Sequence, residues 1–149
     1  MRGFWLLVHF LGFTLWLGGG IATMIAGVTA KRFAPAERLA AYRVMSAVFR
    51  MVIAPGAVGV LVAGFVLSAP YMRGDVPGWL GLMMGTGGLG ALIVLFVVVP
   101  TAARLGRLEL DPRGELPEAF PRLRQTQVIS ASLAGLLAII AMIAGTLLR

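Results

Sequence analysis

The chain has 149 residues and no cysteine, and 59% of its residues are hydrophobic against 13% charged. This composition, with a mean hydropathy of +0.93, excludes an ordinary soluble domain and predicts an integral membrane protein. The lack of cysteine excludes disulfides, thiolate metal ligands and thiol catalysis. The formal net charge is +7, but no basic groove interleaved with aromatic residues accompanies it, so we expect no nucleic-acid partner.

Four apolar runs are long enough to cross a bilayer core of about 30 Å, which takes about 20 helical residues. They cover residues 4–30, 51–71, 79–103 and 128–148. The first run exceeds the apolar part of a secretory signal, about 7 to 15 residues, and we expect it to be a retained helix. The sequence therefore predicts a single domain over residues 1–149, an all-α integral membrane four-helix bundle with short cytoplasmic helical extensions.

The basic residues are distributed unequally between the two ends of this bundle. Ten of them lie within the first and third connections: Lys31, Arg32, Arg38, Arg43, Arg50, Arg104, Arg107, Arg113, Arg122 and Arg124. Only Arg2, Arg73 and Arg149 belong to the opposite end. By the positive-inside rule, connections 31–50 and 104–127 are cytoplasmic. Both termini then lie on the outer side of the inner (cytoplasmic) membrane. The basic side chains are then expected to contact the bilayer through anionic lipid headgroups.

The first cytoplasmic connection has the composition of a helix. Pro35 suits a first helical position and the residues up to Arg50 are good helix formers. We therefore expect the second helix to begin near residue 35, well outside the membrane, and to kink at Pro55.

The other cytoplasmic connection contains a turn signal. Asp111, Pro112, Arg113 and Gly114 fit the four positions of a type I turn. We expect one helical arm to end near Leu110 and the next to start around Pro117 or Pro121.

Twenty glycines, most of them inside the apolar runs, suggest close helix packing, which small residues permit in lipid. Each helix carries a stripe of small residues at three- and four-residue spacing. The predicted packing positions are Gly20, Gly27, Gly56, Gly59, Ala63, Gly81, Gly85, Gly88, Ser130, Ala134, Ala138, Ala141 and Gly145. These stripes exceed the needs of one contact per helix, so we expect other integral membrane subunits as partners. The segment "GTGGLG" follows no strand and predicts no dinucleotide site.

His9 is the only histidine in the chain and lies within the first apolar run. An ionisable residue inside a membrane span is a functional-site hypothesis by default. Its helical face also carries Trp5, Gly12, Phe13, Trp16, Gly20, Thr23 and Gly27. One interpretation is structural, with a neutral His9 hydrogen-bonded to Ser68, a backbone carbonyl or water. The other makes His9 the axial ligand of haem b or of a magnesium tetrapyrrole, with Gly12 and Trp16 bordering the macrocycle.

The motif "VHFLGFTLWLGGG" resembles the opening helix of the small four-helix membrane proteins related to the copper-resistance protein D family and to the haem-containing bacterial protoporphyrinogen oxidase. By this resemblance His9 would be the haem ligand. In the oxidase branch further titratable residues inside the helices support catalysis, whereas here the second, third and fourth spans contain no His, Lys, Asp or Glu between their ends.

These observations favour a non-catalytic role, that of an accessory or assembly subunit packed against other membrane proteins, with no catalytic residues and no dedicated metal site. The alternative function is that of a haem-b-binding membrane oxidoreductase of the protoporphyrinogen oxidase type.

Overall fold

The computed structural model describes residues 1–148, and within them it contains helices and no strands. Four helical segments are long and apolar enough to cross a membrane: Arg2–Arg32, Pro35–Arg73, Gly78–Leu105 and Ala119–Leu147. The predicted all-helical class and the four long apolar segments are confirmed. Arg149, which belongs to the charge pattern above, lies outside the described residues.

The four segments consist of ten consecutive elements. In chain order they are α1 (Arg2–Thr29), η1 (Ala30–Arg32), α2 (Pro35–Val48), η2 (Phe49–Ile53), α3 (Ala54–Ser68), η3 (Ala69–Arg73), α4 (Gly78–Ile93), η4 (Val94–Val98), α5 (Val99–Leu105) and α6 (Ala119–Leu147). Elements η1 and η3 are 3₁₀ turns, and η2 and η4 are π-helical.

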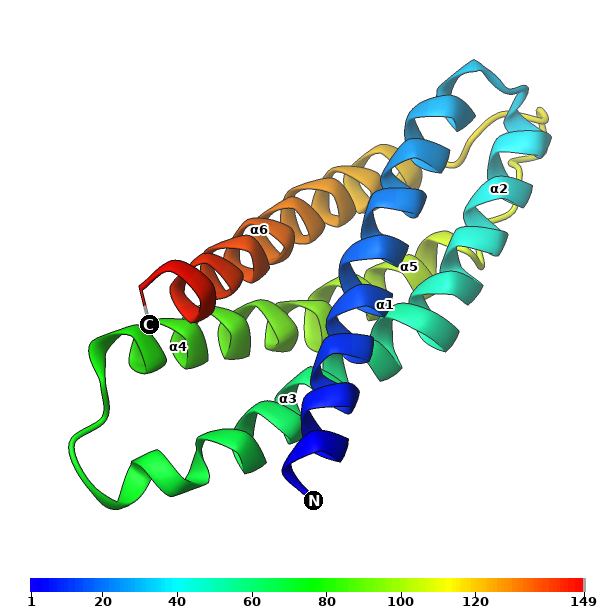
Figure 1. The fold of residues 1–149 in the computed structure, drawn as a ribbon. Coiled ribbons are helices and arrows are strands. Elements are labelled where there is room, and N and C mark those ends of the chain that lie inside the picture. Colours follow the sequence, from blue (N-terminus) through cyan, green and yellow to red (C-terminus); the bar gives the residue numbers. More distant parts are fainter. Residues whose placement is uncertain (149) are drawn as a thin grey trace.

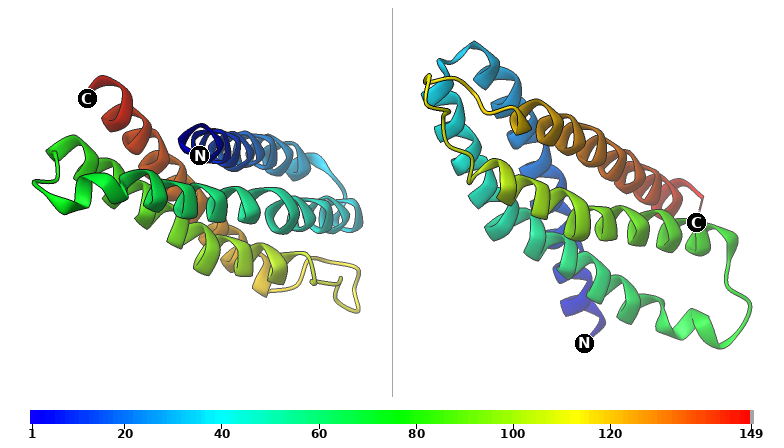
Figure 2. Two further views of the ribbon diagram at one scale, coloured as in Figure 1. Left: turned by 60° about the horizontal axis from the view of Figure 1, so that its bottom comes forward. Right: turned by 180° about the vertical axis from the view of Figure 1, so that it is seen from behind.

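The helices form two packed pairs, α1 on α3 and α4 on α6. Figure 1 shows the start of α1, the end of α6 and the connection from η3 to α4 at one end of the bundle, while the connections after α1 and after α5 lie at the other. The tilted view and the view from behind in Figure 2 agree with this arrangement. Both connections rich in Lys and Arg are thus at the same end. We call this end, formed by residues 30–38 and 104–124, the basic end.

The second helix begins at Pro35, as predicted, well before the apolar run that starts at residue 51. Ala34 is its N-cap residue, and the backbone N–H of Ala34 donates to Oε2 of Glu37 at 3.2 Å. This bond satisfies a donor just before the helix, where no intrahelical partner exists. Residues next to one another in the sequence therefore fix the start of this helix.

A π-helical segment precedes Pro55, where the sequence predicts a kink. Proline has no N–H, so the carbonyl four residues before it loses its usual donor. Segment η2 ends two residues before Pro55, and the N–H of Ala54 donates to the carbonyl of Phe49, five residues back. The same arrangement precedes Pro100, where the N–H of Val99 donates to the carbonyl of Val94.

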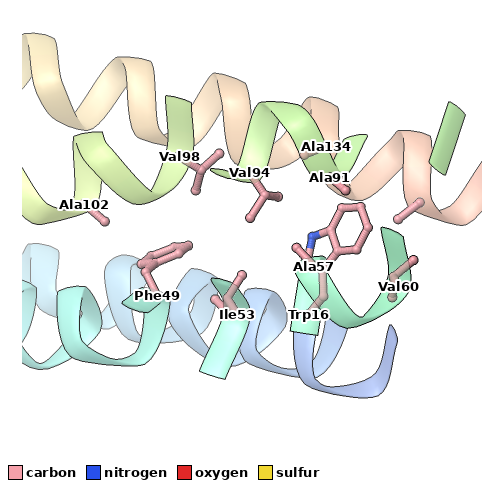
Figure 3. Packing of buried hydrophobic residues seen from close by; sticks show 11 residues of the cluster. Trp16, Phe49, Ile53, Ala57, Val60, Ala91, Val94, Val98, Ala102 and Ala134 are labelled. Carbon is pink, nitrogen blue, oxygen red and sulfur yellow. The ribbon is translucent and has the colours of Figure 1, made fainter. Parts of the chain in front are cut away.

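The two π-helical segments lie on opposite sides of the main hydrophobic core. Figure 3 shows Phe49 and Ile53 of η2 on one side and Val98 and Val94 of η4 on the other. Ile53, Val94 and Val98 are at most 2% exposed. Trp16 of α1 inserts between the two layers in the same cluster. The widened turns thus direct large apolar side chains into the centre of the bundle.

The third long helix ends at Leu105, and the prediction that it continues to near Leu110 is wrong. Gly106 is the C-cap residue of α5, and a Cβ built there would lie 2.7 Å from Cβ of Ser46, so this crossing of α2 requires glycine. Leu108 and Leu110 then pack onto a second buried cluster at the basic end. This tertiary contact replaces the last predicted helical turn.

The predicted turn at Asp111 is confirmed. The N–H of Gly114 donates to the carbonyl of Asp111 at 2.9 Å, and Oδ1 of Asp111 accepts from the N–H groups of Arg113 and Glu115. Gly114 has a φ of 77°, which favours glycine. The last helix, α6, starts at Ala119, between the two predicted starting points.

Candidate functional site

The imidazole of His9 lies against α3 at Gly64. A Cβ built on Gly64 would lie 3.4 Å from Cε1 and 3.7 Å from Nδ1 of the ring, so glycine leaves room for the imidazole. Nδ1 is buried and has no hydrogen-bond partner. The backbone of Val60 approaches the ring, but without forming a hydrogen bond of acceptable geometry. The side chain as a whole is only partly buried, so Nε2 is the nitrogen available to an external ligand.

Ser68 does not serve as the predicted partner of His9. Its hydroxyl donates to the carbonyl of Phe65 at 3.0 Å, within its own helix. Because α1 and α3 are antiparallel, Gly64 rather than Ser68 lies at the level of His9. The expected hydrogen bond between two helices is replaced by a bond within one.

Gly12 makes the closest contact between α1 and α3. A Cβ built on Gly12 would lie 2.7 Å from the carbonyl oxygen of Gly56, and one built on Gly56 would lie 2.7 Å from that of Gly12. Backbone therefore meets backbone at this crossing, as small residues permit. The two backbones leave no space for a macrocycle between them at Gly12, and the cofactor-binding role of Gly12 stays a prediction.

Trp16 is also occupied in helix packing. Its side chain is 3% exposed, and Cη2 would lie 3.2 Å from a Cβ built on Gly90 of α4. The indole fills the junction of the two helix pairs (Figure 3). Its predicted place beside a cofactor stays a prediction.

The inward face of α1 nevertheless follows the sequence pattern. The residues that share the face of His9 are buried or half-buried: Trp5, Gly12, Phe13, Trp16, Gly20, Thr23 and Gly27. Gly27 lies near Met45 and Tyr42 of α2, whereas a Cβ on Gly20 would meet nothing within 4 Å. Gly59 makes ordinary contact with Val8.

The structure corrects the packing face of α4 within the chain. A Cβ built on Gly81, Gly85 or Gly88 would meet nothing within 4 Å. The glycines that contact α6 are Gly87, near Cβ of Ala141, and Gly90, near the carbonyl of Ala134. At about 100° of helix rotation per residue, the contact face lies about 160° from the predicted stripe, nearly on the opposite side of the helix.

On α6 the small stripe faces the bundle. Ser130, Ala134, Ala138 and Ala141 are all buried, and a Cβ on Gly145 would lie 2.7 Å from Sδ of Met83. The small residues of α6 thus allow α4 to pack closely against it.

Gln127 was not singled out from the sequence. Its side chain is 7% exposed, and neither Oε1 nor Nε2 has a hydrogen-bond partner. Gln127 belongs to α6, which packs against η4 and α5 as well as α4. The sequence signal for this residue is its position, an amide side chain directly before the apolar run 128–148.

Residues 1–148 contain no group of three or more His, Cys, Asp or Glu side chains able to hold a metal ion. Comparison with protein-family models, with curated protein sequences and with solved structures finds no match.

Proposed function

We propose that the chain is a polytopic protein of the inner (cytoplasmic) membrane that acts as a non-catalytic accessory or assembly subunit, packed against other integral membrane proteins. Both termini lie on the outer side in this proposal, and the basic end is cytoplasmic. The excess of Lys and Arg at that end supports this orientation.

The outer face of α4 carries the proposal. Gly81, Gly85 and Gly88 share this face, and each has open space where a Cβ would stand. In a lipid environment a stripe of small residues allows a second helix to approach closely, which favours association through packing. The chain's own helices use a different face of α4, so the stripe is free for a helix of another membrane protein.

His9 fits a packing role or that of a tetrapyrrole ligand, but the ligand role is restricted by its surroundings. The contact between Gly12 and Gly56 closes the space between α1 and α3, so haem or a magnesium tetrapyrrole does not fit inside the bundle beside His9. A macrocycle bound through Nε2 fits on the outer surface of the helix pair, or between this chain and a neighbouring subunit. Bound there, haem would supply electron-transfer chemistry and a magnesium tetrapyrrole light absorption.

A haem-b-binding oxidoreductase is the second candidate function. The observation that favours it is the imidazole of His9, whose Nδ1 makes no hydrogen bond within the chain and whose Nε2 is available. The absorption spectrum distinguishes this function from the accessory role. A haem protein would show a Soret band after purification, and the band would disappear in His9→Ala. A colourless protein that co-purifies with a larger complex would contradict it.

Pull-down in a mild detergent, followed by mass spectrometry, tests the accessory role. In Gly85→Leu we expect partners to be lost while the melting temperature is kept, because leucine adds bulk on the outer face and is fully compatible with lipid. Gly87→Leu should instead lower the melting temperature, since Cβ of Ala141 lies only 3.3 Å from a Cβ at that position.

Gly18→Leu serves as the control for added bulk, because Gly18 lies on an exposed part of α1 with nothing within 4 Å. A partner counts only if Gly18→Leu retains it and Gly85→Leu loses it. Equal retention by both variants would mean that the stripe of α4 faces lipid and that the proposed interface is wrong.

A further inference from the structure

The basic end contains a pocket of about 330 Å³ between α2 and the start of α6. Two arginines line it, Arg38 of α2 and Arg124 of α6, together with the carboxylate of Glu118. Phe120 and Leu116 provide apolar walls. The pocket thus combines two fixed positive charges, one negative charge and an apolar side.

Arg38 is positioned by an aromatic ring. Its Cζ lies 5.1 Å from the ring centroid of Phe120, and its Nε is buried without a hydrogen-bond partner. Phe120 is only 3% exposed, so the ring is a fixed platform. The ring covers one face of the guanidinium and Nε is buried, so the two terminal nitrogens carry the donors that can recognise an oxyanion.

Arg124 is positioned by the same aromatic pair. Its Nε donates to the hydroxyl oxygen of Tyr42 at 3.1 Å. Tyr42 packs edge-to-face on Phe120, with centroids 5.1 Å apart and an interplanar angle of 85°. Because this hydrogen bond uses Nε, the two terminal nitrogens of Arg124 keep their donors. One buried aromatic pair therefore holds both arginines at the pocket.

We propose that this pocket binds a phosphate group through Arg38 and Arg124. Guanidinium groups bind phosphate with two parallel hydrogen bonds, and these are stronger than neutral hydrogen bonds. Side chains that are already fixed lose less conformational entropy on binding. The carboxylate of Glu118 disfavours further negative charge and suits an ammonium group attached to the phosphate, as in a zwitterionic phosphodiester.

A phospholipid headgroup and a soluble phosphate ester share this chemistry, and the position of the pocket favours the lipid. On α2 and α6 the last exposed large apolar side chains before the basic end are Val44 and Val128. Arg38 and Arg124 lie beyond them by about 9 Å and 6 Å along the helix axes, at 1.5 Å per residue. The headgroup region is about 5 to 7.5 Å deep on each side of a bilayer, so Arg124 lies within it and Arg38 at its outer edge. The preference for a lipid over a soluble phosphate ester rests on the proposed membrane location, whereas the binding of a phosphate group does not.

Two probes test the site on the purified full chain. Native mass spectrometry measures retention of phosphatidylethanolamine, with diacylglycerol as the lipid without phosphate, and a thermal-shift titration uses glycerol 3-phosphate. We expect Arg38→Gln and Arg124→Gln each to weaken binding of the phosphate-bearing probe about tenfold, since charge-assisted hydrogen bonds are lost.

The chain offers matched controls on the same two helices. Arg43→Gln on α2 and Arg122→Gln on α6 remove the same charge from exposed positions that do not line the pocket, and we expect binding within twofold of the unchanged protein. Tyr42→Phe keeps both charges but removes the acceptor of Arg124, so binding should weaken severalfold. Gel filtration and melting temperature establish that each variant is folded.

Phosphatidylethanolamine binding that depends on both pocket arginines, without a response to glycerol 3-phosphate, identifies a lipid site. An arginine-dependent response to glycerol 3-phosphate identifies a soluble phosphate ester. If the pocket variants and the controls bind both probes equally, the phosphate site is overturned. Recovery of the protein in the soluble fraction would instead overturn the proposed membrane role and leave the glycerol 3-phosphate result standing.

Discussion

Gly12 and Gly56 bring α1 and α3 together backbone to backbone, and each would place a Cβ 2.7 Å from the carbonyl oxygen of the other. A Cβ at this distance from backbone cannot be accommodated by a side-chain rotation. We expect Gly12→Ala to force the helices apart and to lower the free energy of unfolding by about 1 to 3 kcal/mol, as in overpacked cores.

Thermal melting in detergent measures this effect. Gly20→Ala is the control on the same helix, because a Cβ there meets nothing within 4 Å, and its melting temperature should not fall. If both variants melt at the same temperature, α1 and α3 do not approach as closely as described.

Gln127 predicts a stabilising substitution. Its amide is buried without a hydrogen-bond partner, and burial of an unpaired polar group costs free energy. Gln127→Met keeps the unbranched length and removes the amide, so we expect the free energy of unfolding to rise by about 1 to 2 kcal/mol. Thermal melting measures the change. A fall in stability would mean that the amide bonds to a water or ligand bound between α5 and α6.

The imidazole of His9 makes no hydrogen bond through Nδ1 within the chain, and its contact with Gly64 is one of packing. We therefore expect His9→Leu to change the free energy of unfolding by less than about 1 kcal/mol. Leucine retains the apolar contact, and no hydrogen bond within the chain is lost.

Melting temperature and the absorption spectrum are measured together on His9→Leu, with His9→Gln as the polar control. A marked loss of stability in His9→Leu alone would show that His9 has a polar partner outside this chain. Loss of a stoichiometric chromophore in both variants, with the fold retained, would assign His9 as a tetrapyrrole ligand.

The proposed orientation is tested by cysteine labelling, which is simple because the chain has no cysteine of its own. Single cysteines replacing Arg38 and Arg113 at the basic end should be protected from an impermeant thiol reagent added to intact cells. A cysteine replacing Gly74, in the connection at the opposite end, should be labelled. Labelling of the first two and protection of the third would invert the topology.

Local signals in the sequence determined several parts of this fold. The four apolar runs predict the four long helices because each run is long enough to cross a bilayer as a helix. The start of the second helix at Pro35 and the turn at Asp111 depend on backbone preferences and on hydrogen bonds within a few residues. The inward face of α1 followed from the aromatic residues that share its helical stripe.

Tertiary structure alone decided which face of α4 packs, what lies beside His9 and where the third helix ends. Gly85 and Gly87 are both small residues in an apolar helix, and only the position of α6 distinguishes them. The pairing of Tyr42 with Arg124 joins residues 82 positions apart in the chain. A helix that is apolar all round has no hydrophobic period to mark its inward side, so the contacts with its neighbours select that side.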